Sequence, residues 1–348
     1  GTIFEVAWPR ALLSAFLSAL LVAGHWATTP RDQLQRWAMP DPAHPLVARL
    51  KVISGMWDLQ LTLTTFVTTF FMSHAYAFWR NAYGLARSIQ GKLSDTAMLL
   101  STNGAREPAT GAYTPEARAL LDTSLRRLSA LHVLFWAGMV RRAPASDFFG
   151  LSFNQMLSRR ALERLVHRGS ITAVERDALL GVGSNPRTWH LALLAWVLSD
   201  AEEARRRGVL VGGVGLEASL HDMGRKLRAA TSTLPDEVAA RMPMAYVHFV
   251  QVLVDVLCLM APFALFPRAG LLTVFLAATV CLFFEGLVEL CKTFLDPFGN
   301  RRVSNADFRA DVQVDVLIAE SNAGLTMWPR RVEALTKRVA ATTTGAAD

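Results

Sequence analysis

The feature that most constrains this chain is an apolar run that begins near Leu271, acquires charged residues and stops at a turn. Glu285, Glu289 and Lys292 lie in the second half of the run, and Pro297-Phe298-Gly299 ends it. Carboxylates in a helix of membrane length are costly unless they face protein or a water-filled cavity. The run therefore predicts a membrane helix whose acids face the inside of an assembly, along a pathway.

The composition is that of a membrane protein with a large polar part. Of the 348 residues, 52% are hydrophobic and 19% are charged, whereas an ordinary soluble domain has about 25% charged residues. The net charge of +7 fits nucleic acid, anionic lipid or an anion path as a partner, and the lack of a nucleic-acid motif sets the first aside. Cys258, Cys281 and Cys291 have neither metal nor disulfide spacing, so we expect structural thiols.

Four stretches are long and apolar enough to span a bilayer, which takes about 20 residues. They lie at 11–28, 53–79, 244–266 and 271–295. Only a few residues around Pro267 separate the last two, which predicts a helical hairpin. The chain is therefore expected to be a multi-pass protein of the lipid bilayer.

The block between the second and third spans is rich in arginine and helical in pattern. Segments 124–140 and 190–203 predict helices, and Thr172 with Glu175 predicts a capping box. Basic flanks favour a cytosolic location. The expected domains are 1–84 with membrane helices 1 and 2, a cytosolic helical region at 85–241, membrane helices 3 and 4 at 242–299, and a cytosolic C-terminal segment at 300–348, which we expect to fray from Lys337 onward.

The second span carries a stripe of possible pore residues. Thr62, Phe66 and Phe70 fall at i, i+4 and i+8, on one side of a helix. Repeated around a symmetry axis, they would form rings of hydroxyl groups and phenyl edges. The edge of an aromatic ring is positive, so such a neck can pass a weakly hydrated anion or close by dewetting. The alternative is that Phe66 and Phe70 are ordinary helix-packing residues.

Several segments together resemble the bestrophin anion channels. Residues 283–299, with their acids followed by Pro-Phe-Gly, are similar to the end of the last bestrophin membrane helix. Residues 74–83 resemble the small-Tyr-x-x-aromatic-x-x-Ala stretch that ends the second helix. Further similar segments occur in the family's order at 1–4, 165–172, 242–246 and 311–320.

The resemblance implies an all-α fold with four transmembrane helices and a large helical cytosolic region, assembled as a homopentamer around a central pore. It places Thr62, Phe66 and Phe70 at the pore neck and Met242 at the cytosolic aperture. Thr62 stands where animal members carry an aliphatic residue, so we expect a wetter neck. The implied function is passive conduction of chloride and other small anions. The residues show no catalytic constellation, so no enzyme activity is expected.

The resemblance also raises the question of calcium. Some bestrophins bind Ca²⁺ in a clasp of carboxylates just after Pro-Phe-Gly, and calcium takes six to eight oxygen ligands. Here Arg301 and Arg302 stand where acids would be expected, while Asp296 and Asp307 are left as a possible clasp remnant. The alternative is a helix-capping loop that binds no calcium.

The acids of the last apolar run, and the chain as a whole, allow more than one role. Glu285 and Glu289 are expected to pair with basic residues or to face a polar interior, although they could instead sense protons or voltage. The chain could also be a membrane-anchored scaffold whose helical block binds a partner. A third possibility is the channel module of a larger regulated fusion, since bestrophin-like domains occur fused to domains such as rhodopsin photosensors.

Overall fold

The computed structural model describes residues 3–28, 40, 44–140, 157–181, 185–299 and 312–344. Within these ranges the chain is helical, and β pairing is limited to two isolated bridges. The predicted all-α fold is therefore confirmed. The α-helices are α1 (Ile3–Thr28), α2 (Pro45–Asn103), α3 (Pro115–Met139), α4 (Arg159–His167), α5 (Ala173–Gly181), α6 (Trp189–Arg206), α7 (Val214–Ala239), α8 (Met244–Ala269), α9 (Thr273–Phe294) and α10 (Val314–Thr344).

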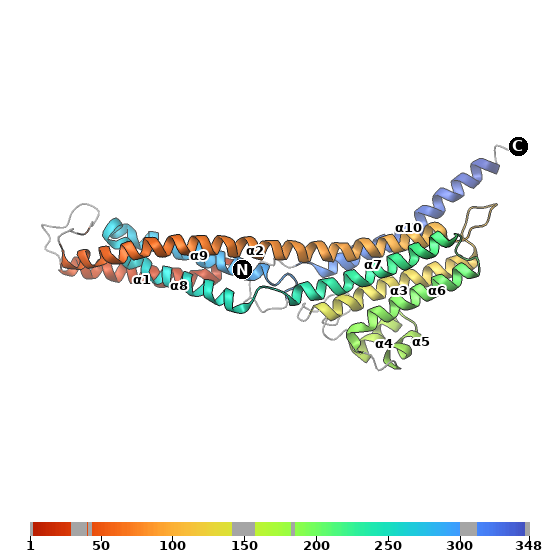
Figure 1. The fold of residues 1–348 in the computed structure, drawn as a ribbon, viewed down its shortest axis with the longest axis horizontal. Helices are drawn as coiled ribbons and strands as arrows, with labels where there is room; N and C mark the ends of the chain where they lie inside the picture. Colours follow the sequence, from red (N-terminus) through yellow and green to blue (C-terminus); the bar gives the residue numbers. More distant parts are fainter. Residues whose placement is uncertain are drawn as a thin grey trace. The chain divides into compact units, whose positions relative to one another are not determined.

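The described residues form two compact units. Unit 1 takes its residues from 3–81 and 241–297, and unit 2 from 82–240, 298–299 and 312–344. The 59-residue helix α2 runs without interruption from Pro45 to Asn103 and contributes to both. In unit 1, α1, α8 and α9 accompany the first part of α2, and in unit 2, α3, α6, α7 and α10 accompany its second part (Figure 1).

Helices α8 and α9 form the predicted hairpin, but the turn lies later than expected. α8 continues through Pro267 to Ala269, and a single 3₁₀ turn at Gly270–Leu272 leads into α9. Gly270 has a φ of 53°, a left-handed conformation that a residue without a Cβ adopts most readily. The turn thus begins close to the predicted link at Pro267 and Arg268, and slightly after it because α8 accommodates Pro267 in its last turn.

The core of unit 1 is apolar and tightly filled. Leu257 of α8 and Val288 of α9 are fully buried in it. All three cysteines are buried free thiols, and their purely structural role stays a prediction. The indole of Trp57 donates a 3.1 Å hydrogen bond to the carbonyl oxygen of Leu257 and so ties α2 to α8.

Two stretches of the described chain are long and apolar enough to cross a membrane, Val6–Thr28 and Met244–Phe294. The first lies in α1, and the second comprises α8, the turn and α9. The predicted span at 53–79 lies within α2 and is not one of these two stretches. The number of membrane crossings therefore stays a prediction.

Unit 2 confirms the helices predicted at 124–140 and 190–203, which lie in α3 and α6. The predicted capping box is also present. The backbone N–H of Thr172 donates to Glu175 Oε2 at 2.7 Å, and the N–H of Glu175 donates to Thr172 Oγ1 at 3.1 Å. Arg126 and Arg127 donate to the same carboxylate. Burial alone would raise the pKa of Glu175, but these hydrogen bonds outweigh it and lower the pKa to about 2.

The predicted fraying from Lys337 onward is wrong as far as Thr344, because α10 is helical to that residue. Two contacts hold this end of the helix. The Thr336 hydroxyl donates to the carbonyl oxygen of Gly111 at 2.8 Å, and Lys337 lies 3.2 Å from the carboxylate of Glu333. The first of these joins residues far apart in the chain, which a local sequence pattern does not reveal.

Two buried histidines of unit 2 predict a loss of stability in acid. Burial lowers the pKa of His132 to about 3 and that of His190 to about 4, from an ordinary value of 6.5. Between pH 6.5 and about 4 the unfolded chain therefore binds protons that the folded chain does not. The unfolding free energy should fall with decreasing pH by about 1.4 kcal/mol per pH unit for each histidine.

Denaturant unfolding of the purified protein, followed by far-UV circular dichroism between pH 7.5 and 4, measures this slope. His132→Gln, which keeps an acceptor for the 2.8 Å hydrogen bond from Trp136, should reduce the slope. His167→Gln, at an exposed histidine, serves as the control and should leave it unchanged. Equal slopes in the two variants would contradict the assignment to His132.

Candidate functional site

The stripe predicted on the second span lies on α2 within unit 1, and it faces away from the core of that unit. Thr64, Thr68, Phe71 and Ala75 form the buried face. At about 100° per residue, Phe66 lies about 180° around the helix from the centre of that face.

The side chains of the stripe are exposed in the single chain and close to one another. Phe66 is 61% exposed and Phe70 48% exposed, with ring centroids 4.7 Å apart. Thr62 is also exposed, and its hydroxyl donates to the carbonyl oxygen of Asp58 at 2.9 Å. A threonine that bonds its own helix in this way is satisfied even in apolar surroundings. The structure thus brings the three residues together on one outward face, and their role as a pore neck stays a prediction.

Asp58 lies one turn before Thr62 and forms an ion pair with Arg268, in the last turn of α8. The two guanidinium nitrogens of Arg268 contact its two carboxylate oxygens at 2.8 and 2.5 Å. This two-pronged geometry is the most directional form of an arginine–carboxylate contact. It joins α2 to the end of α8 beside the hairpin turn.

Glu285 and Glu289, the acids of the last apolar run, belong to a connected set of polar side chains. We call the set the polar network; its members are Arg10 of α1, Gln251 and Asp255 of α8, and Glu285, Glu289 and Lys292 of α9. It contains three carboxylates and two cations. Its most buried carboxylate, that of Glu285, is 5% exposed, and a charge in that position needs partners.

Each buried acid of the polar network has a partner. Arg10 donates to the carboxylate of Glu285 and lies 3.2 Å from Asp255. The Gln251 amide nitrogen donates to Asp255 at 3.0 Å and to Glu285 at 3.2 Å. Lys292 donates to the Gln251 amide oxygen at 2.8 Å and lies 3.4 Å from Glu289. The amide therefore connects the two ion pairs of Arg10 with the Lys292–Glu289 pair into one set across three helices.

Glu285, Glu289 and Lys292 were predicted from the sequence as notable polar residues, whereas Arg10 and Gln251 were not. Two signals could have found them. Arg10 is an isolated cation at the start of an apolar stretch, and Gln251 lies four residues before Asp255, on the same side of a helix. Whether the polar network senses protons or voltage stays a prediction.

The predicted clasp remnant is only partly within the described chain. Asp296 is 6% exposed and lies just before the turn, where Gly299 has a φ of 62°. Asp307 lies outside the described residues. Within the part of the chain that the structure describes, the three side chains close enough to share a metal ion are Glu202, Glu217 and His221, and that group does not include Asp296. A calcium site therefore stays a prediction.

Met242, predicted at the cytosolic aperture, precedes α8 and is half-buried. It lies against the apolar core of unit 1. Its role at an aperture is likewise a prediction that depends on the assembly.

The fold is that of known proteins. A variant of a bacterial bestrophin homologue from Klebsiella pneumoniae superposes with a TM-score of 0.66 at 16% identity, covering 94% of this chain and 98% of its own. The unaltered homologue gives 0.62 at 16% identity, with coverages of 92% and 97%. A chain described as a membrane protein gives 0.63 at 15% identity, with 93% and 98%. No family model and no curated protein matches the sequence.

At this identity the comparison establishes the fold, and the predicted bestrophin-like fold is confirmed over more than nine tenths of the chain. The order of the helices and the long α2 are thus part of a known architecture. Anion conduction, assembly and the pore residues do not follow from the fold alone, and neither does fusion to a regulatory domain.

A double-mutant cycle tests whether the polar network holds unit 1 together. Arg10→Gln leaves the buried Glu285 carboxylate without its cation and should lower the unfolding free energy by about 2–4 kcal/mol. Glu285→Gln leaves a half-exposed arginine and should cost about 1 kcal/mol. The double variant should resemble Glu285→Gln alone, since the uncompensated charge is then gone.

Unfolding in detergent micelles measures these values. Arg80→Gln is the control, because Arg80 is exposed and has no ion pair within the described chain; it should change stability by less than about 0.5 kcal/mol. Strictly additive effects of the two substitutions would show that Arg10 and Glu285 do not interact.

Proposed function

We propose that this chain is a subunit of a bestrophin-like anion channel, a homopentamer that conducts chloride and other small anions passively through a central pore. The observation that carries the proposal is a bestrophin fold whose α2 presents Thr62, Phe66 and Phe70 on the face away from its own subunit. The fold supplies the class of protein, and the outward stripe supplies a surface suited to lining a pore.

The exposed stripe has a physical reason to lie on a symmetry axis. An exposed pair of phenylalanines next to a threonine row needs cover from lipid, from a partner or from copies of itself. Around an axis, the same residues of each copy meet at one height and form a narrow ring. Phenyl edges carry partial positive charge and attract a partly dehydrated anion, whereas their apolar faces favour drying when no ion is present.

Unit 1 also supports a location in the bilayer. Besides the two apolar stretches, α1 exposes large apolar side chains that include Leu13 and Phe16, and α9 exposes Phe275 and Phe283. Apolar surface of this extent marks a membrane or an interaction site. The proposal therefore includes four spans, with α2 crossing beside α1, α8 and α9.

A planar bilayer recording under a chloride gradient tests the channel. Purified, verified oligomer should give single-channel currents that reverse near the chloride equilibrium potential. Silence from such an oligomer would favour the membrane-anchored scaffold instead. Recording with and without calcium tests the clasp, because a current indifferent to calcium would exclude calcium-dependent gating through Asp296.

Replacing both phenylalanines tests the neck. Phe66→Ala with Phe70→Ala should widen the ring and make drying harder, which should raise the open probability and relax selectivity among anions. Phe275→Ala is the control, since Phe275 is also an exposed phenylalanine of unit 1 but lies on another helix. Selectivity and open probability identical to the unaltered channel would exclude α2 as the pore-lining helix.

A further inference from the structure

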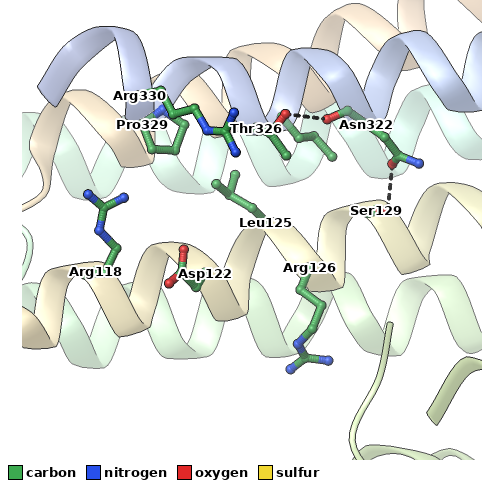
Figure 2. Close-up of a pocket in the computed structure, with 10 residues that line it drawn as sticks. Arg118, Asp122, Leu125, Arg126, Ser129, Asn322, Thr326, Pro329 and Arg330 are labelled. Atoms are coloured by element: carbon green, nitrogen blue, oxygen red, sulfur yellow. Dashed lines mark hydrogen bonds between the residues drawn. The ribbon is translucent and has the colours of Figure 1, made fainter. Parts of the chain in front are cut away.

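A groove of about 350 Å³ lies in unit 2 between α3 and α10 (Figure 2). This volume is within the range of small-molecule sites in proteins. The groove is separate from the stripe on α2 and from the polar network, and neither the fold nor the proposed channel explains it. Its lining residues are Arg118, Asp122, Leu125, Arg126, Ser129, Asn322, Leu325, Thr326, Pro329 and Arg330.

Two contacts between the helices bracket the groove. At one end Arg118 of α3 is paired with Glu333 of α10. At the other, the Ser129 hydroxyl lies 2.6 Å from the amide oxygen of Asn322 (Figure 2). The two contacts are about three helical turns apart along each helix, so both ends of the groove are fixed while its middle stays open.

The groove also has a fixed floor and wall. Leu125 and Leu325 are buried beneath it. Trp328 donates from its indole nitrogen to the Ser94 hydroxyl at 2.9 Å, which holds α10 against α2. Such a site is pre-organised, because a ligand would not have to order the helices that form it.

The polar lining is dominated by arginine. Arg126 is already engaged, since it donates to Glu175 at 2.7 and 3.0 Å. Arg118 shares its guanidinium with Glu333 and with the Tyr113 ring, 5.1 Å away. Arg330 is exposed and makes no ion pair within the described residues.

The directions of the side chains suit an anion. Figure 2 shows Arg330 extending from α10 along the groove toward Thr326, and Arg118 pointing from α3 toward α10. Asp122 is the single acid in the lining. A planar guanidinium with no ion pair in the described chain, in a groove that a second guanidinium also lines, matches the oxygens of a carboxylate or phosphate.

We propose that this groove binds a small organic oxyanion, a carboxylate or a phosphate ester that also carries an apolar part. Arg330 and Arg118 bind the charged oxygens, and the apolar part lies on Leu125, Leu325 and Pro329. Asp122 accepts a hydrogen bond from a donor on the ligand. The site is independent of the proposed pore, so either can fail without the other.

Isothermal titration calorimetry on the full chain in detergent, at constant ionic strength, tests the proposal with three probes: inorganic phosphate, phenyl phosphate and benzoate. Phenyl phosphate should bind saturably and more tightly than inorganic phosphate, because it also covers the apolar floor. Saturation by benzoate as well would show that the site takes oxyanions in general, and saturation by phenyl phosphate alone would restrict it to phosphate esters.

Three variants separate a built site from general surface charge. Arg330→Gln should weaken phenyl phosphate binding about tenfold, through loss of a charge-assisted contact. Arg331→Gln is the matched control: Arg331 is the next residue of α10, exposed, without an ion pair in the described chain and outside the groove lining. It should leave binding unchanged. Thr326→Trp, at an exposed lining position, should block the groove while keeping every charge.

Far-UV circular dichroism and thermal unfolding verify that each variant is folded. Absence of saturable binding for all three probes would overturn the proposal, including the case in which a second copy of the chain covers the groove. Equal weakening by Arg330→Gln and Arg331→Gln would overturn it as well, because binding would then depend on surface charge rather than on the groove.

Discussion

The buried carboxylate of Glu285 is the constraint on which the arrangement of unit 1 depends. An ionised acid among apolar helices costs several kcal/mol unless a cation and hydrogen-bond donors reach it. Those groups come from two other helices, Arg10 from α1 and Gln251 from α8. Sliding either helix by one turn, about 5.4 Å, would separate the partners. Apolar packing alone tolerates several registers, whereas the polar network permits one.

Helix α2 carries two different surfaces, because packing within unit 1 uses only one of them. The core of unit 1 uses only one side of this helix, and Trp57 attaches that side to α8 through one hydrogen bond. The opposite side is left with Thr62, Phe66 and Phe70, which make no contribution to the core. Residues with no role in folding their own chain are free to serve another function. In the proposed channel, the residues that stabilise the protein would thus be separate from those that line the pore.

Local pattern was enough to predict the helical class, the α8–α9 hairpin and the capping box of Thr172 and Glu175, because each depends on residues a few positions apart. Local pattern failed where contacts between residues far apart in the chain determine the structure. The helical end of α10 near Lys337 is held by Thr336, which reaches Gly111, 225 positions away. The partners of Glu285 lie 275 and 34 positions away. The stripe on α2 was found by its spacing, but the partner it would face in the proposed assembly lies outside a single chain and cannot be predicted from a local pattern.

The pairing of arginines with acids determines where the protein can attract and hold an anion. The net charge of +7 suggests a broad positive field that gathers anions, yet many arginines of unit 2 are paired with nearby acids, as Arg126 is with Glu175 and Arg127 with Glu175 and Asp200. A paired guanidinium attracts a passing anion weakly. The attraction therefore depends on those cations that have no acid beside them within the described residues, and Arg330 is one of these that lines a groove with a fixed floor. An anion gathered by the general field meets a surface there that can hold it, which distinguishes a binding site from a conduction path.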